Sequence, residues 1–144
     1  LRHSSKCVRK TIDKTEEIKM SAKFYICEHC GNLVGMIHDS GVPMMCCGQK
    51  MTALVPNTVE ASGEKHLPAV TVEDGAIHVN VGSVDHPMLP EHFIEWVYVQ
   101  TENGGQRKVL KPGDKPHVTF FLGDDKAVAV YAYCNIHGLW KTEI

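Results

Sequence analysis

Four cysteines within a 21-residue window constrain the fold of this chain more than any other feature. Cys27 and Cys30 form a Cys-x-x-Cys pair, and Cys46 and Cys47 follow as direct neighbours. A segment of about 40 residues cannot bury enough apolar surface to fold unaided. We therefore expect residues 20–55 to form a small domain that a metal bound to these cysteines holds together.

The spacing of these cysteines leaves the identity of the metal open. Four thiolates can hold either zinc or iron in a tetrahedron. A zinc ribbon would show a second Cys-x-x-Cys pair, whereas the side chains of Cys46 and Cys47 diverge and would bind one metal only with an angular distortion. A disulfide between these neighbours has poor geometry. His29 could be a further ligand, but four cysteines already complete the shell.

From about residue 58 the sequence changes to short β-type runs separated by turn signals. Ile77, Val79 and Val81 alternate with polar residues, and residues 73–75 read Glu-Asp-Gly, a good hairpin turn. The expected strands cover residues 69–73, 77–81, 93–100, 106–111, 117–122, 127–133 and 139–142. Seven closely spaced strands predict an immunoglobulin-like antiparallel β-sandwich over residues 58–144, so the whole chain is expected to be all-β.

A second set of metal-binding residue types is spread along this β-rich segment. Cys134 and His137 lie near its end, and His66, His86 and His92 lie upstream, near strand ends and loops. A closed structural zinc site needs only four ligands. One thiolate with four imidazoles suits a redox iron better, and five ligands leave one position free for a small substrate.

The other histidines fit surface or packing positions. They are His3 in the N-terminal tail, His38 in a loop of the cysteine segment, and His78 and His117 on expected strands. A blue-copper domain is a rival interpretation, because it too is a β-sandwich with a late cysteine. Such a site usually adds an axial methionine after its second histidine, and the last methionine here is Met88.

Composition excludes several classes of function. The net charge is −2, so there is no basic field for nucleic acid. No apolar run approaches the roughly 20 residues that span a bilayer. Residues 1–19, which include Cys7, have neither the apolar core nor the cleavage site of an export signal, and we expect a mobile N-terminal extension. Clustered cysteines without such a signal favour metal binding in a reducing cytoplasm over disulfides.

Taken together, these residues resemble desulfoferrodoxin, the two-iron family of superoxide reductases. The resemblance covers nearly everything from Met20 to Ile144. The motifs that carry it are Tyr25-Ile-Cys-Glu-His-Cys-Gly31, Cys46-Cys-Gly48, Gly63-Glu-Lys-His-Leu-Pro68, Asp85-His-Pro87, Glu91-His92 and Cys134-Asn-Ile-His-Gly138. Each motif alone is weak, but their combination is highly specific.

The resemblance implies both centres and the reaction. It places one iron in a desulforedoxin-like domain, bound by Cys27, Cys30, Cys46 and Cys47. It places a second iron in the sandwich, with His66, His86, His92 and His137 in a plane and Cys134 as axial ligand. The family reduces superoxide to hydrogen peroxide with one electron and two protons, and a small carrier such as rubredoxin re-reduces the iron. It also implies a homodimer.

Glu64 and Lys65 are the candidate catalytic residues. The positive charge of Lys65 would draw in the superoxide anion, and Lys65 could organise proton delivery through water. The resemblance makes Glu64 the sixth ligand of the oxidised iron. Without the neighbouring His66, an exposed loop pair would be the simpler interpretation. A two-centre electron carrier without substrate, and a zinc-stapled interaction module, remain alternatives to the enzyme.

Overall fold

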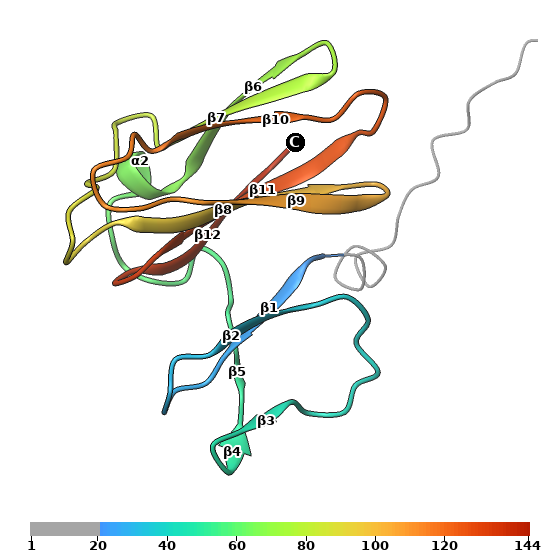
Figure 1. Cartoon of the computed structure of the whole chain (residues 1–144), viewed down its shortest axis with the longest axis vertical. Helices are drawn as coiled ribbons and strands as arrows, with labels where there is room; N and C mark the ends of the chain where they lie inside the picture. Colours follow the sequence, from blue (N-terminus) through green and yellow to red (C-terminus); the bar gives the residue numbers. More distant parts are fainter. Residues whose placement is uncertain (1–20) are drawn as a thin grey trace, which may run out of the picture. The chain divides into compact units, whose positions relative to one another are not determined.

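The computed structural model describes residues 21–144, which form two compact units that divide between Thr52 and Ala53 (Figure 1). The expected N-terminal extension, residues 1–19, and its Cys7 lie outside the described residues. None of the helices in the described part of the chain is long and apolar enough to cross a membrane.

The first unit consists of short strands and turns. Its strands are β1 (Lys23–Ile26), β2 (Leu33–Met36), β3 (Met45–Cys46), β4 (Gln49–Lys50) and β5 (Thr52–Ala53). They form a three-stranded sheet in the order β2-β1-β5 and a two-stranded β3-β4 hairpin. Between residues 21 and 52 the buried apolar side chains are Phe24, Cys27 and Met51. So small a core cannot by itself stabilise the unit.

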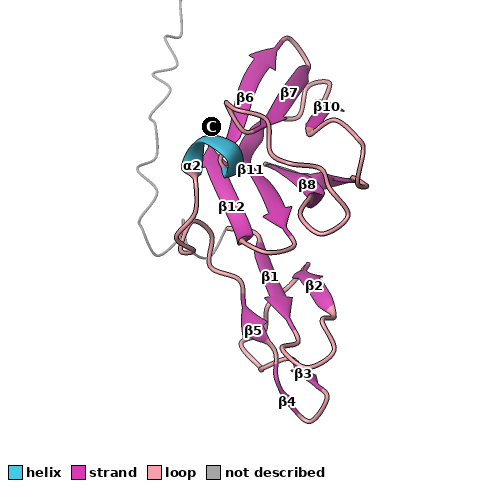
Figure 2. Cartoon of the chain, turned by 90° about the vertical axis from the view of Figure 1, so that its left-hand side faces the viewer, coloured by secondary structure: helices cyan, strands magenta, loops and turns pink. Residues whose placement is uncertain are grey.

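The second unit has seven strands and is a β-sandwich, as the sequence predicts. Figure 2 shows the unit coloured by secondary structure. The strands are β6 (Pro68–Glu73), β7 (Ala76–Val81), β8 (Ile94–Thr101), β9 (Gly104–Val109), β10 (His117–Phe121), β11 (Ala127–Cys134) and β12 (Gly138–Glu143). One sheet has the order β10-β7-β6 and the other β12-β11-β8-β9, with antiparallel pairing throughout. The all-β fold class is therefore confirmed.

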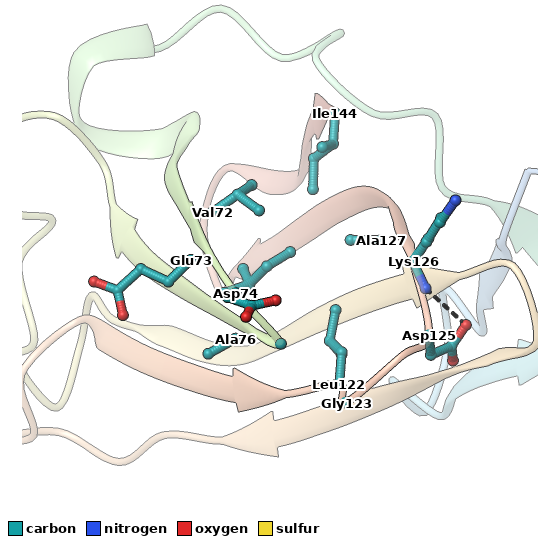
Figure 3. Close-up of a pocket in the computed structure, with 12 residues that line it drawn as sticks. Val72, Glu73, Asp74, Ala76, Leu122, Gly123, Asp125, Lys126, Ala127 and Ile144 are labelled. Atoms are coloured by element: carbon teal, nitrogen blue, oxygen red, sulfur yellow. Dashed lines mark hydrogen bonds between the residues drawn. The ribbon is translucent and has the colours of Figure 1, made fainter.

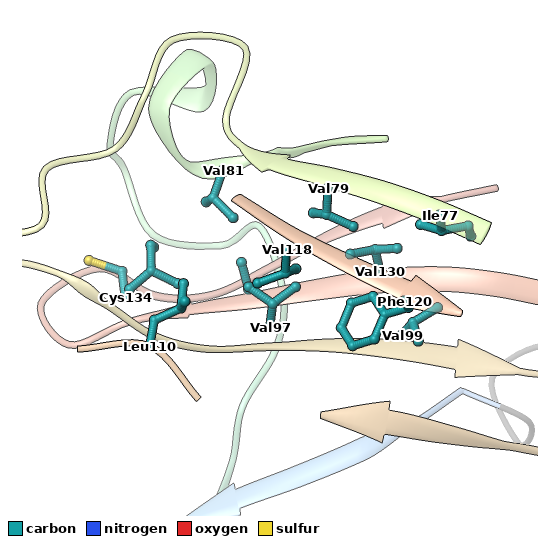
Figure 4. Packing of buried hydrophobic residues seen from close by; sticks show 12 residues of the cluster. Ile77, Val79, Val81, Val97, Val99, Leu110, Val118, Phe120, Val130 and Cys134 are labelled. Atoms are coloured by element: carbon teal, nitrogen blue, oxygen red, sulfur yellow. The ribbon is translucent and has the colours of Figure 1, made fainter. Parts of the chain in front are cut away.

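Local sequence explains the hairpins and the inward faces. Glu73 pairs with Ala76, so Asp74 and Gly75 form a two-residue turn, and Gly75 has the positive φ of 72° that such a turn requires. The predicted alternation on β7 is observed, because Ile77, Val79 and Val81 are buried and His78 and Asn80 are partly exposed. Both sheets contribute to one buried cluster, and Cys134 lies at one end of it (Figure 4).

Candidate metal centres

The histidines and the cysteine predicted for the second site meet at this end of the sandwich. His66 lies on α2 (Gly63–His66), a single helical turn before β6. His86 follows β7, and His92 precedes β8. Cys134 is the last residue of β11, and His137 lies in the turn to β12. Their five donor atoms all lie within 4.8 Å of one another.

The four imidazole rings form a square. Neighbouring centroids are 4.6 Å apart for His66–His86, 4.6 Å for His86–His92, 5.0 Å for His92–His137 and 4.8 Å for His137–His66. Neighbouring rings are nearly perpendicular, while His66 and His92 face each other at 6.3 Å. The sulfur of Cys134 lies 3.8 Å from Nδ1 of His137. Four nitrogens around a centre, with one sulfur, suit the expected planar set and its additional thiolate.

Backbone carbonyls fix the tautomers of two of these rings. His66 Nδ1 donates to the carbonyl oxygen of Ser62 at 2.7 Å, and His86 Nδ1 donates to that of Pro87 at 2.6 Å. Their Nε2 atoms therefore carry lone pairs, yet they face each other at 3.1 Å. A cation between them would satisfy both, and carbonyl partners of this kind are usual behind metal-binding histidines.

His92 supplies independent support for a bound cation. Its Nε2 is buried and has no hydrogen-bond partner among the described residues. Leaving such an atom unpaired costs about 1–3 kcal/mol. His92 is a member of the group whose five donor atoms meet, so a metal ion bound through this nitrogen would satisfy it. The residues present thus fit the metal that the sequence predicts.

Burial sets the protonation of the site. Desolvation lowers the pKa of His66 and His92, and it lowers that of His86 to about 4. These rings are therefore neutral at pH 7 and available as ligands. Burial raises the pKa of the Cys134 thiol, whereas the amide of His137, which donates to its sulfur at 3.4 Å, acts in the opposite direction. A bound cation would favour the thiolate further.

Asn135 joins the two loops that carry His92 and His137, a role that the sequence did not reveal. Its amide group donates to the carbonyl oxygen of Glu91 at 3.0 Å, and its side-chain oxygen accepts from the backbone of Phe93 at 3.0 Å. Its own backbone N–H donates to the carbonyl oxygen of Phe93 at 3.2 Å. These bonds bracket His92 and fix it beside the turn that follows Cys134.

Trp140 is a second residue that the sequence analysis missed. Its indole stacks on the ring of His66, with centroids 4.9 Å apart and an interplanar angle of 29°. The indole Nε1 donates to the carbonyl oxygen of His137 at 3.2 Å. One side chain therefore orients two members of the square. Its position three residues after His137 was the available signal, but only folding brings it against His66.

Glu64 and Lys65 precede His66 on α2, and both side chains are exposed. The positive charge of Lys65 reaches the square, because it adds to burial in lowering the pKa of His66 and His92. An anion that approaches the square would meet this charge.

The four cysteines of the first unit also come together, with all four sulfurs within 4.8 Å of one another. The Sγ of Cys30 lies 3.6 Å from that of Cys46, which is 4.0 Å from that of Cys47. The first pair sits on a turn in which Gly31 donates its N–H to the carbonyl oxygen of Cys27 at 2.9 Å. Cys47 adopts a left-handed backbone with φ 51°, which turns its side chain toward the group despite its direct neighbour.

The thiols of this group differ in acidity. The backbone N–H of Cys30, which donates to the sulfur of Cys27 at 3.5 Å, is the main cause that lowers the pKa of Cys27 to about 6. Interaction with the Cys30 side chain is the main cause that raises the pKa of Cys47 to about 12. A strongly bound cation would be needed to remove the proton from Cys47 at neutral pH.

The remaining described histidines stay outside both groups. His29 and His38 are exposed. His78 contacts Glu73 at 3.0 Å, and His117 contacts Asp85 at 3.0 Å, both on the solvent side of their sheet. His3 lies outside the described residues.

A hollow of about 240 Å³ lies between the β6–β7 turn and the segment that joins β10 to β11 (Figure 3). Val72, Leu122 and Ile144 are among its lining residues, and the lining contains neither histidine nor cysteine. It is therefore unrelated to the two candidate centres.

Fold and sites together define a β-sandwich protein with a histidine–thiolate centre, preceded by a four-cysteine unit. Comparison with known proteins agrees. The family described as Desulfoferrodoxin matches residues 58–143, and its N-terminal domain matches residues 20–54. The chain belongs to the desulfoferrodoxin family.

Individual relatives cover most of the chain. A desulfoferrodoxin of Syntrophotalea carbinolica is 44% identical over 119 residues, which are 83% of this chain and 94% of that protein. A desulfoferrodoxin homolog of Archaeoglobus fulgidus is 43% identical over 82% of this chain and 94% of its own length. The crystal structure of the superoxide reductase from Treponema pallidum is similar with a TM-score of 0.72 and 39% identity, covering 85% of this chain and 99% of that one.

Proposed function

We propose that this chain is a superoxide reductase, which adds one electron and two protons to superoxide and releases hydrogen peroxide. The observation that carries the proposal is the square of four imidazoles with the sulfur of Cys134, next to an exposed lysine, Lys65, on the same helical turn as His66. A relative from Pyrococcus horikoshii, 38% identical over 57% of this chain, is itself a superoxide reductase.

Both centres are iron centres in this family, and the donor sets of this chain fit that metal. His66, His86, His92, His137 and Cys134 would hold the iron of the sandwich, and the four cysteines of the first unit would hold the other. Iron supplies the single electron that superoxide takes up. Neutral imidazoles and one thiolate leave a ferrous site with a net positive charge, which favours an anionic substrate.

Lys65 guides the substrate in this proposal. Its ammonium group adds positive potential where superoxide, a small anion, must approach. It also orders water that passes protons to the departing peroxide. The backbone N–H of His137 donates a hydrogen bond to the sulfur of Cys134, which stabilises negative charge on that sulfur and thereby tunes the centre.

Glu64 has a separate role, in the oxidised protein. A carboxylate is a hard anionic ligand that prefers ferric over ferrous iron. Glu64 would therefore hold the sixth position only after the substrate has been reduced. It closes the oxidised site to other anions and leaves the reduced site open.

The first unit receives electrons in this proposal. Two of its four sulfurs, those of Cys30 and Cys47, belong to exposed residues and can approach a donor protein. The family resemblance favours a rubredoxin-like carrier as that donor and a homodimer as the assembly. The five described cysteines are free thiols, which agrees with a cytoplasmic location.

We also propose two domains, at residues 20–55 and 58–144, after an N-terminal extension at residues 1–19. The family matches at residues 20–54 and 58–143 support this division, as does the separation of the compact units after Thr52.

A pulse of superoxide mixed with the reduced, iron-loaded protein tests the function. The expected result is oxidation of the sandwich iron at a rate proportional to protein concentration, with one hydrogen peroxide per iron and no dioxygen beyond that of spontaneous dismutation. If the ferrous centre is unchanged while superoxide decays at its spontaneous rate, the chain is an electron carrier. If the protein contained zinc in both sites after expression in iron-containing medium, the zinc-stapled interaction module would be the remaining interpretation.

A further inference from the structure

The loop that follows β7 forms hydrogen bonds to the backbone of α2. The backbone N–H of Val84 donates to the carbonyl oxygen of Glu64 at 3.0 Å, and the hydroxyl of Ser83 donates to the same oxygen at 3.3 Å. The N–H of Gly82 donates to the carbonyl oxygen of Val84 at 3.1 Å and closes the loop. A carbonyl of the Glu64–Lys65 pair is thus held by a segment about 20 positions away in the chain.

Gly82 lies buried where this loop meets α2. A Cβ at this position would stand 2.5 Å from the carbonyl oxygen of Glu64, 2.8 Å from that of Leu67 and 3.1 Å from the carbonyl carbon of Lys65. All three atoms belong to the backbone, so none can move away from an added Cβ as the end of a flexible side chain could. Gly82 is not among the glycines with positive φ, so the requirement for glycine here is one of space.

α2 is anchored at its last residue, His66, by the stack on Trp140, and the helix contributes little stability of its own. It is a single turn, and isolated turns are unstable in water. Ser62, at its N-terminus, makes no side-chain capping bond. The same loop also reaches a second member of the square, because the backbone N–H of His86 donates to the carbonyl oxygen of Val81 at 2.8 Å.

We infer that Gly82 is a positioning residue that sets where Glu64 and Lys65 stand beside the histidine–thiolate centre, and thereby how strongly this centre admits anions. The inference rests on the proposed function and deepens it. A side chain at residue 82 would push α2 outward and carry both charged groups with it. Glu64 would then close the oxidised site less well, which tightens the binding of added anions, and Lys65 would attract anions less strongly, which weakens it. Glu64 competes directly for the position that the anion takes, whereas Lys65 acts through an exposed charge that salt screens, so we expect the first effect to be the larger.

The test compares three variants of the full-length, iron-loaded protein. Gly82→Ala adds the Cβ that meets backbone. Gly63→Ala adds a Cβ to α2 itself, where the nearest atom is Cδ1 of Leu67 at an ordinary 3.5 Å, and serves as the matched control. Ser83→Ala removes only the hydroxyl bond to Glu64 and provides a milder disturbance of the same contact. Iron content, the visible spectrum of the oxidised protein and its titration with azide are measured for each.

We expect Gly82→Ala to keep its iron, to shift the spectrum of the oxidised protein and to bind azide at least about threefold more tightly than the parent. Gly63→Ala should match the parent, and Ser83→Ala should lie between them. In a Glu64→Ala background the added Gly82→Ala change should no longer tighten azide binding, because the carboxylate whose displacement causes the tightening is already gone.

Three results would overturn the inference. One is azide binding by Gly82→Ala equal to that of the parent. Another is an azide effect that persists undiminished in the Glu64→Ala background. The third is loss of iron from Gly82→Ala while Ser83→Ala binds azide as the parent does, since Gly82 would then serve only the iron ligands. The azide titration needs no superoxide, so a parent protein that failed to react with superoxide would end the proposed function and leave this test intact.

Discussion

The two candidate metal centres are held by opposite means. In the first unit, three apolar side chains are buried between residues 21 and 52, and two of the four ligand cysteines are exposed. In the sandwich, twelve residues form a buried cluster, and the relative exposures of Cys134, His66 and His86 are 0%, 2% and 2%. One centre lies in a unit with almost no core, and the other is built at the end of a large one.

This difference teaches what each metal contributes. In the first unit a metal takes the place of a core, so metal binding and folding are the same event. In the sandwich, strands and backbone carbonyls position the candidate ligands, so we expect the site to keep its shape without its metal. A preformed, buried site can keep one coordination position for a substrate, whereas exposed sulfurs suit the entry of electrons.

Replacing Cys30 with Ser should have the largest effect. The first metal is lost, and with it the stability of residues 21–52, because binding to structural sites of this kind contributes on the order of 10 kcal/mol. Hydrogen exchange of β1 and β2, combined with metal analysis, measures this. Cys134→Ser is the control and should leave β1 and β2 protected. Slow exchange in β1 and β2 of Cys30→Ser would mean that the unit has a core independent of its metal.

Replacing His92 with Ala should remove the second metal without unfolding the sandwich. Mutating a group that hydrogen-bonds a metal ligand typically lowers the metal affinity 10–100-fold. Losing a ligand itself should therefore lower the metal affinity more than about 100-fold. Removing the ring also removes the free-energy cost of its unpaired Nε2, and this offsets the stability lost with the packing of the ring. Both tryptophans, Trp96 and Trp140, lie in the sandwich, so their fluorescence reports its melting. A metal-free variant that melts more than about 10 °C below the metal-free parent would contradict a preformed site.

Acid should weaken the metal-free sandwich. The pKa of His86 falls from 6.5 to about 4 on folding because of burial, and those of His66 and His92 fall too. Between these pH values the unfolded chain binds more protons, so the free energy of unfolding is greatest above pH 6.5 and falls as the pH is lowered toward 4. Urea unfolding followed by tryptophan fluorescence at pH 7, 6, 5 and 4 measures it. A His86→Gln variant should show a shallower fall, and equal slopes would refute the assignment.

Replacing Lys65 with Ala should slow the reaction with superoxide by about three- to tenfold, since one exposed charge supplies part of a steering field. The dependence of the rate on ionic strength should also flatten, because salt screens attraction between opposite charges. Lys126→Ala is the control, because it removes an equal charge far from the site. Lys126 precedes the first residue of β11, whereas Cys134 is the last residue of that strand. An unchanged rate with an unchanged salt slope would remove Lys65 from the mechanism.

The smallest kinetic effect is expected for Glu64→Ala. Oxidation of the reduced centre should keep its rate within about twofold, because the carboxylate prefers the ferric state. The oxidised protein should bind azide more tightly and change its visible spectrum. Glu60→Ala, a charge-matched change before α2, should leave both unchanged. If Glu64→Ala matches the parent in spectrum and azide affinity, Glu64 is an ordinary exposed carboxylate.

The amino-acid sequence alone determined the ligand types and the strands. Cysteine and histidine in these spacings have few other uses, and alternation such as that of Ile77, Val79 and Val81 reports directly which side of a strand is buried. These signals are local or chemically rare, so they can be read without a fold. The all-β class and both groups of donors could be predicted for that reason.

The tertiary structure decided how the second site is held together. Asn135 bonds to Glu91, Trp140 stacks on His66, and Gly82 meets the backbone of α2. Each contact joins segments that lie roughly 20 to 75 positions apart, and each depends on sheet pairing that no short motif specifies. Asparagine, tryptophan and glycine also have many ordinary uses, so only the folded chain shows which contacts these three residues make around the second site.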